Sequence, residues 1–329
     1  MKAIVYRAYG GPDVLRCEDI EKPSPAAAEV LIRVRAASVN PLDWHYMRGT
    51  PYLVRLGAGL RTPTTPRLGV DLAGAVESVG RNVTTFRPGD EVFGAGRGAF
   101  GEYVCAKEGK LAMKPANATF EQAAAVPIAA LTALQGLRDK GRLERGQTVL
   151  INGAAGGVGT FAVQIAKAFG ADVTGVCSAR NVGMVRSIGA DRVIDYAEED
   201  FTRSGQRYDL ILDSVGNHAL SECRRALTAR GTLVMVGGPD NGRWFGPLAG
   251  VLEAAVQSWF VRQRLVMILA SLNKDDLVVL KELMEAGKVT PVIDRCYALG
   301  DVPDAIRYLE AGHARGKVIV TLGPGSAAS

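Results

Sequence analysis

The chain has 329 residues, which suggests about two domains and allows a large apolar core without disulfides or metals. Its hydrophobic fraction of 47% and charged fraction of 22% are typical of a folded protein. The 39 glycines are more than average but show no three-residue period, which excludes a collagen-like fibre. The net charge of +5 is spread along the chain, so we expect no dedicated nucleic-acid site, although it suits a small anionic ligand.

Five cysteines lie far apart and form no CxxC pair, so neither a disulfide framework nor a zinc knuckle is indicated. The first ten residues lack the apolar core of a signal peptide. The longest apolar stretch, residues 251–270, contains Glu253, Arg262 and Arg264, which argue against a spanning helix. We therefore predict a cytoplasmic protein without a membrane span.

Residues 1 to about 120 are expected to be rich in β-structure. Short β-branched segments occur at 3–6, 29–37, 73–79 and 91–93. Glycine and proline separate these segments, as in the run Arg87-Pro88-Gly89-Asp90. Many short strands with tight turns predict a small barrel.

From about residue 120 onward, strands alternate with helices. Thr119 and Gln122 have the spacing of a capping box and begin a helical stretch through residues 123–140, which we expect to be interrupted around Pro127. Strands are then expected at 148–152, 172–177, 192–194, 210–213, 232–236 and 264–272. Helices are expected at 158–169, 181–188, 218–226 and 251–260, and the tail adds helices at 274–286 and 302–311 and β-segments at 292–297 and 317–322. The alternation predicts a doubly wound parallel sheet.

A glycine-rich turn lies between the strand 148–152 and the helix that follows it. Aligned to G-x-G-x-x-G, the turn has Ala154 in the first place, then Gly156 and Gly159. Gly156 allows the backbone to approach a pyrophosphate, and Gly159 allows the helix to pack closely on the strand. The helix N-terminus at Gly157 and Val158 offers free N–H groups to phosphates. The turn predicts a dinucleotide site, with a tight structural turn as the alternative.

The residues at the end of the next strand, 172–177, indicate whether the site prefers NAD or NADP. NAD-preferring sites place a carboxylate there for the ribose hydroxyls, whereas this strand ends in Cys177-Ser178-Ala179-Arg180. Arg180 supplies a planar donor fork for a 2′-phosphate, and Ser178 adds a hydrogen bond. The alternative is that Ser178 caps a helix and Arg180 is solvated. We predict NADP(H).

Taken together, these segments resemble the medium-chain dehydrogenase/reductase superfamily. The resemblance rests on GVDLAGAVESVG (69–80), RPGDEVFG (87–94), FGEYV (100–104) and the AAGGVG turn, and it covers nearly the whole chain. It implies a GroES-like β-rich catalytic domain formed by residues 1–122 and 272–329. It also implies a Rossmann NADP(H)-binding domain over residues 123–271.

The zinc ligands of the superfamily's alcohol dehydrogenases have no counterparts here. Asn40 stands at the position of their catalytic cysteine, and Val70 at that of their histidine. Only residues 95–99 remain where they carry a four-cysteine lobe. Leu42 replaces the hydroxyl of their proton relay. We therefore expect no bound metal, and no Lewis acid to lower the pKa of an alcohol.

Without these zinc ligands, the sequence is similar to the zinc-free, quinone-oxidoreductase-like branch of the superfamily. ASVNPLDW (37–44) resembles its N-P-x-D/E segment, and GHARGKVIV (312–320) resembles its reticulon-4-interacting-protein-like subgroup. The resemblance implies hydride transfer from NADPH to a small hydrophobic quinone or α,β-unsaturated carbonyl. Two alternatives are an enoyl-thioester reductase and a low-turnover NADPH-binding protein that senses redox state or binds a partner.

The resemblance implies four candidate catalytic residues. Asn40 would donate its amide to a substrate carbonyl, or is simply a turn residue before proline. Asp43 would orient a donor, or only stabilise a helix N-terminus. His45 stands where several quinone reductases carry a tyrosine and is a candidate proton donor, or an exposed histidine without a role. Tyr46, the next residue, is the substitute donor.

Further cofactor contacts are implied for Thr132, Tyr196, Val215, Gly237 and Lys317. Thr132 would touch the nicotinamide end, and Tyr196 would flank the 2′-phosphate. Val215 and Gly237 follow strands at the carboxyl edge of the sheet, where ligands bind in open α/β folds. Lys317 would reach a phosphate, or is a solvated charge at a strand end. The resemblance also implies a homodimer that pairs through the edge segment 264–271.

Overall fold

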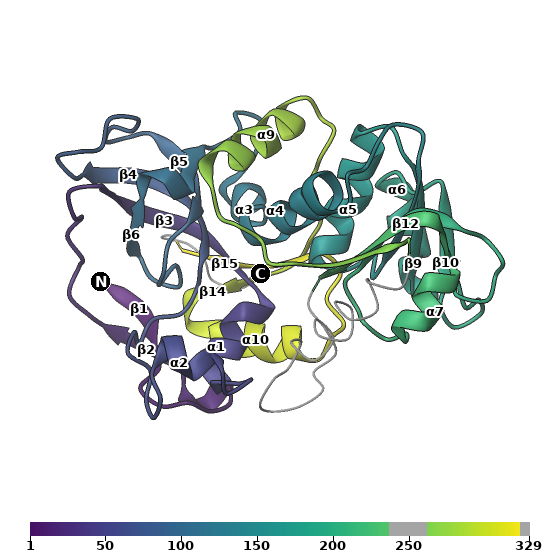
Figure 1. The fold of residues 1–329 in the computed structure, drawn as a ribbon. Helices are drawn as coiled ribbons and strands as arrows, with labels where there is room; N and C mark the ends of the chain where they lie inside the picture. Colours follow the sequence, from purple (N-terminus) through teal and green to yellow (C-terminus); the bar gives the residue numbers. More distant parts are fainter. Residues whose placement is uncertain (237–261, 323–329) are drawn as a thin grey trace. The chain divides into compact units, whose positions relative to one another are not determined.

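The computed structural model describes residues 1–236 and 262–322, and the chain divides into two compact units (Figure 1). The first unit contains Met1–Ile128, Leu272–Gly287 and Pro291–Ser329. The second contains Ala129–Ser271 and Lys288–Thr290. The predicted helix 251–260 and Gly237 lie outside the described residues.

The first unit is built on a seven-stranded sheet and a separate hairpin-like pair. The order across the main sheet is β14 (Ile293–Ala298), β15 (Lys317–Thr321), β3 (Glu29–Val39), β4 (Asp71–Val79), β5 (Glu91–Ala95) and β7 (Leu111–Met113), with β6 (Tyr103–Lys107) paired to β3. The small sheet pairs β1 (Lys2–Val5) with β2 (Arg16–Asp19) in antiparallel fashion. The β-rich character predicted for the first 120 residues is therefore present, and the C-terminal strands complete the sheet.

The helices of the first unit are short. They are α1 (Pro41–Arg48), α2 (Val54–Ala58), α3 (Phe120–Ala124), α9 (Lys274–Glu285) and α10 (Val302–Glu310). The helices α1 and α2 were not predicted, and neither were the strands β2, β6 and β7. α1 carries a helical start signal, because the Asp43 carboxylate at its third position accepts a bond from the Asn40 N–H at 2.8 Å. Its stretch is too short and too mixed to show a helical hydrophobic period.

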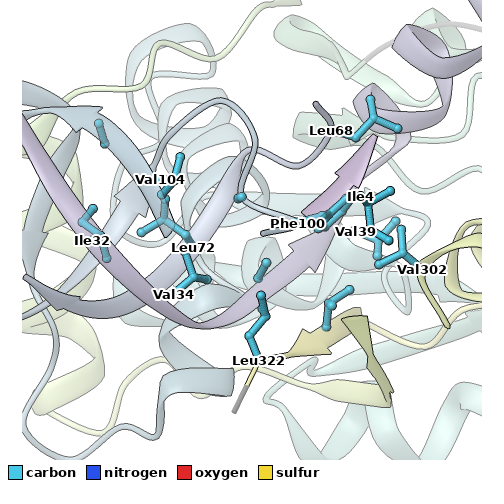
Figure 2. Packing of buried hydrophobic residues seen from close by; sticks show 14 of the residues in the cluster. Ile4, Ile32, Val34, Val39, Leu68, Leu72, Phe100, Val104, Val302 and Leu322 are labelled. Carbon is cyan, nitrogen blue, oxygen red and sulfur yellow. The ribbon is translucent and has the colours of Figure 1, made fainter. Parts of the chain in front are cut away.

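The core of this unit lies between the long central strand and its neighbours (Figure 2). Figure 2 shows Val34 of β3 near Leu72 of β4 and Val104 of β6, whereas Val39, at the end of β3, lies near Ile4 and Phe100. Burial alternates along part of β3, as expected for a sheet with one packed face, and becomes continuous at its end, where residues 36–39 are all buried. The buried end of β3 leads directly into Asn40 and α1, so the candidate catalytic segment is anchored in the core.

The second unit contains a six-stranded sheet in which every pairing is parallel. The order is β10 (Arg192–Asp195), β9 (Asp172–Cys177), β8 (Thr148–Asn152), β11 (Tyr208–Asp213), β12 (Leu227–Val236) and β13 (Arg264–Ile268). When the six strands are renumbered in chain order from β8, their order across the sheet is 3-2-1-4-5-6. This is the doubly wound arrangement of dinucleotide-binding folds. The predicted parallel sheet is confirmed.

Different helices cover the two faces of this sheet. Leu150, Ile211 and Leu233 lie side by side in the register and share an apolar cluster with Cys223 of α7 (Leu220–Arg225). On the other face, a Cβ at Gly136 would contact Leu212 at 3.0 Å. Gly136 begins a π-helical segment after α4 (Pro127–Gln135). The remaining helices are α5 (Gly157–Ala168) and α6 (Val182–Ser187).

The boundary between the units falls six residues later than the sequence analysis expected. The predicted helix over 123–140 is divided between α3, α4 and the π-helical segment, with Pro127 as the first residue of α4. The N–H of Ile128 donates to Asp71 of the first unit at 3.1 Å, so the chain remains part of that unit up to this point. Residues 288–290 belong to the second unit, where the Gln164 amide bonds both backbone groups of Thr290.

Candidate functional site

The glycine-rich turn of the second unit joins β8 to α5. Gly153 has a φ of +84°, and a Cβ there would lie 2.6 Å from the Ser214 hydroxyl. A Cβ at Gly159 would lie 2.0 Å from the carbonyl oxygen of Gly153. Ala154 is buried, and its N–H donates to Val176 of β9 at 3.0 Å. Side chains are therefore excluded where the helix meets the strand, as the fingerprint requires.

The donor set at this turn fits a pyrophosphate. Gly156 is the N-cap of α5 and has no capping side chain, and a Cβ there would approach only the Gly153 oxygen, at 3.3 Å. The N–H groups of Gly157, Val158 and Gly159 form the first turn of the helix and have no acceptor among the described residues. Free amides, the positive end of the helix dipole and an open backbone together favour an anion at this position.

The end of β9 presents the residues predicted to select the cofactor. Ser178 caps a short helical turn, Ala179–Asn181, and its hydroxyl accepts a bond from the Asn181 amide at 3.1 Å. Arg180 is exposed in that turn. Tyr196 is 63% exposed, and its N–H donates to the Cys177 carbonyl at 3.1 Å, which places it beside the end of β9. Ser178, Arg180 and Tyr196 thus form one group with no carboxylate between residues 177 and 181.

Two other predicted cofactor residues also lie in this unit. Val215 follows β11 and is 48% exposed, and its N–H donates to Asp213 at 3.0 Å. The Asp213 carboxylate also accepts bonds from the Asn152 amide and from the Gly216 N–H, so it fixes the turn after the strand. Thr132 is buried in α4.

A buried polar cluster occupies the end of β3 in the first unit. Because β3 lies between β15 and β4, its last residues have Lys317 on one side and Asp71 on the other. The Lys317 ammonium donates to the Asn40 amide oxygen at 2.6 Å. The Asn40 nitrogen donates to Asp71 at 2.9 Å and to the Ser38 carbonyl at 3.3 Å. Asn40, Asp71 and Lys317 are each 3% exposed or less.

Burial shifts the pKa values of the charged groups in this cluster. It raises the pKa of Asp43 to about 7, although the N–H groups of Asn40 and Gly69 bond the carboxylate. Burial also raises the pKa of Asp71, against the opposing effect of Lys317. The pKa of the Lys317 ammonium is lowered by burial, and the two carboxylates counteract that change. One buried cation therefore stabilises two buried carboxylates.

A cavity of about 400 Å³ lies beside the cluster, within the size range of small-molecule sites. Leu42, Asp43 and Tyr46 of α1 line it, whereas Asn40 and His45 are not lining residues. It is also lined by Tyr6, Glu29, Ala58, Thr64, Thr65, Arg67, Leu68, Gly69, Val70, Ala95, Gly96, Arg97, Cys105, Ala106, Lys107, Lys110 and Leu272. Burial raises the pKa of Tyr6 to about 12, and the nearby Tyr46 and Asp43 contribute to that rise.

These contacts correct three of the predicted roles. Asn40 is not an available substrate donor, because both of its amide hydrogens are already given to Asp71 and Ser38. His45 bonds the Thr50 carbonyl through Nδ1 and packs against the Trp44 ring, away from the cavity lining. Lys317 is neither solvated nor directed at a phosphate, because its ammonium is enclosed and bonds Asn40 and Val39.

Several contributors to the site were missed. Asp71 is one of them. It begins β4, whose next three residues are buried, and a carboxylate in that position indicates a buried polar partner. Tyr6, Arg67 and Arg97 come from segments distant in sequence and meet only at the cavity. No local pattern in the sequence distinguishes them from residues outside the site.

Within residues 1–236 and 262–322, no helix has the length and hydropathy that crossing a bilayer requires.

Two models of known protein families match the sequence of this chain. One, described as alcohol dehydrogenase GroES-like domain, matches residues 26–116. The other, described as zinc-binding dehydrogenase, matches residues 188–320. Together the two models extend over parts of both units.

Individual proteins match over almost the whole chain. The mouse (Mus musculus) mitochondrial NAD(P)H oxidoreductase RTN4IP1 is 36% identical over 98% of this chain and 89% of its own length. The chloroplastic NADPH-dependent alkenal/one oxidoreductase of Arabidopsis thaliana is 35% identical over 97% of this chain and 79% of its own. The structure of Escherichia coli quinone oxidoreductase complexed with NADPH has a TM-score of 0.81 at 28% identity, covering 98% of this chain and 100% of that one.

Proposed function

Because the chain belongs to the medium-chain dehydrogenase/reductase superfamily, in its quinone-oxidoreductase-like branch, we propose that it is an NADPH-dependent reductase of quinones or α,β-unsaturated carbonyls. The observation that carries the proposal is the β8–α5 turn, whose free amides and excluded side chains fit a dinucleotide pyrophosphate. The similar proteins reported above are named for NAD(P)H, alkenal/one and quinone chemistry. The bound cofactor would supply the hydride.

The residues of the first unit would bind and polarise the acceptor. We assign the carbonyl contact to the Tyr46 hydroxyl, because Tyr46 lines the cavity and His45 does not. A neutral phenol is a good donor to an oxygen on which negative charge develops. Asn40 and Asp43 hold the start of α1 in place, Asp43 through the N–H groups of Asn40 and Gly69. Such fixed positioning suffices for acceptors that are already electrophilic.

The reaction is proposed to need no zinc. Asn40 and Val70 stand where the zinc enzymes have a cysteine and a histidine, and neither side chain is a good zinc ligand. The Lys317 ammonium lies 2.6 Å from the Asn40 amide oxygen, so a divalent cation at that position would be repelled.

The experiment that tests this function is NADPH oxidation by protein treated with a strong chelator. We expect loss of the nicotinamide absorbance on addition of some member of a quinone and enone panel, at an unchanged rate after chelation. NADPH binding without oxidation across the panel would instead support a low-turnover binding protein. Reduction confined to enoyl-thioesters would support the thioester alternative.

Cofactor preference provides a second prediction. Arg180→Ala is expected to weaken NADPH binding by about tenfold or more, because a guanidinium–phosphate hydrogen bond contributes about 1.5–3 kcal/mol. NADH has no 2′-phosphate, so its affinity should change little. Titration of both nucleotides by fluorescence measures the two effects. Equal losses would show that Arg180 does not bind the 2′-phosphate.

The predicted dimer and location remain proposals. β13 is the edge strand of the six-stranded sheet, the position from which a second copy could extend it, and sedimentation would test this. A cytoplasmic location is also a prediction. Two of the similar proteins are named as mitochondrial and chloroplastic.

A further inference from the structure

The cavity of the first unit carries an excess of positive charge. Arg67, Arg97, Lys107 and Lys110 line it, and none of them has an ion pair within the described part of the chain. Unpaired cations inside a concave surface attract anions from solution, because the low-dielectric walls concentrate the field.

The carboxylates of the cavity do not neutralise these cations by contact. Asp43 is bonded to the N–H groups of Asn40 and Gly69. Glu29 accepts a bond from the Ala26 N–H at 3.1 Å. The burial that raises the pKa of Asp43 to about 7 reduces its negative charge further at neutral pH.

The two arginines come from neighbouring segments. The Gly98 N–H donates to the Gly69 carbonyl at 2.9 Å, and a Cβ at Gly98 would lie 3.2 Å from the Cβ of Arg67. Arg97 is held by the Thr65 hydroxyl at 3.3 Å. Its charge lowers the pKa of Tyr6, against the larger effect of burial, and Tyr46 raises that pKa, so Arg97 and Tyr46 both lie near Tyr6.

We propose that the acceptor carries a carboxylate, which Arg67 and Arg97 bind while its carbonyl meets Tyr46; this inference rests on the proposed reductase function. Guanidinium groups match a planar carboxylate through paired N–H···O bonds. The volume of about 400 Å³ holds a small acidic enone or quinone. The carboxylate would orient the electrophilic end and lower KM relative to a neutral analogue.

The test compares 4-oxo-2-pentenoic acid with its methyl ester, in which a neutral ester replaces the carboxylate. We expect the wild-type protein to have a higher kcat/KM for the acid, and this preference should decline as salt is added. In the double variant Arg67→Met/Arg97→Met, the ratio of kcat/KM for acid to ester should fall by about tenfold to a hundredfold. Arg81→Met, an exposed arginine outside the cavity, is the matched control and should leave the ratio unchanged.

A binding measurement separates this inference from the reductase proposal. Calorimetry with 4-oxopentanoate, the saturated acid, requires no turnover, and its binding should be lost in the double variant and kept in Arg81→Met. Equal kcat/KM for acid and ester, or binding unaffected by the double substitution, would overturn the inference while leaving the reductase function intact. If neither compound is reduced but 4-oxopentanoate binds through the arginines, the reductase proposal fails for this acceptor and the anion site stands.

Discussion

Gly159→Ala is expected to lower NADPH affinity by at least about a hundredfold, the equivalent of losing two charge-assisted hydrogen bonds. The added methyl would lie 2.0 Å from the Gly153 carbonyl oxygen and 2.8 Å from the Ala154 Cα. Both are backbone atoms and cannot rotate away. The start of α5 must therefore move, and its first-turn amides move with it. Fluorescence titration with NADPH measures the loss.

Gly183→Ala is the matched control for this substitution. Gly183 lies in α6 of the same unit, and a Cβ there would meet nothing within 4 Å. Alanine should fit and stabilise the helix by up to about 1 kcal/mol, since glycine is the poorer helix former. NADPH affinity within about twofold of wild type in Gly159→Ala would contradict the assignment of the turn as the pyrophosphate site.

Lys317→Met is expected to reduce the free energy of unfolding by about 3–5 kcal/mol, the usual cost of leaving a buried charge without a compensating charge. Methionine fills similar space but leaves Asp71 and Asp43 buried without their cation. It also removes the donor that holds the Asn40 amide oxygen at 2.6 Å. Urea unfolding measures the change. Lys140→Met, an exposed lysine of the second unit, is the control and should change stability by less than about 0.5 kcal/mol.

The deficit of Lys317→Met should depend on pH. Without the ammonium, the folded-state pKa values of Asp43 and Asp71 rise further above the ordinary aspartate value of 3.8. A carboxyl with a raised pKa in the folded state contributes stability at low pH that is lost as pH rises through that pKa. The difference from wild type should therefore be larger at about pH 8 than at about pH 5. A deficit independent of pH would argue against uncompensated carboxylates as its cause.

The second unit was largely predictable because its signals are local. Strands 148–152 and 172–177 agree with β8 and β9 at both ends, and the glycine signal of the turn between β8 and α5 lies within a run of six residues. Buried parallel strands are continuous apolar runs bounded by glycine, which a sequence displays directly. Ser178 and Arg180 were proposed because they follow β9 at the place where such folds select the cofactor, whereas Tyr196 was suggested by the family resemblance alone.

The first unit was less predictable because its site depends on pairing between distant strands. Lys317 and Asp71 are 246 positions apart and meet only because β15 and β4 both flank β3. The sequence suggested Asn40 as a donor, yet its amide hydrogens are used by Asp71 and Ser38. The choice between His45 and Tyr46 required the helix α1, which the sequence analysis missed, since only the helix places Tyr46 with Leu42 on the cavity side.

The most direct test of zinc-independent hydride transfer is isotope transfer from NADPH in which both hydrogens at the reactive carbon of the nicotinamide are replaced by deuterium. With an enone that the metal-free protein reduces, we expect the reduced product to carry deuterium at its β-carbon, one atom for each NADPH consumed. That result would show hydride transfer between the nucleotide and the acceptor. NADPH consumption without deuterium in the product, or transfer that disappears when metal is removed, would contradict a zinc-independent hydride-transfer enzyme.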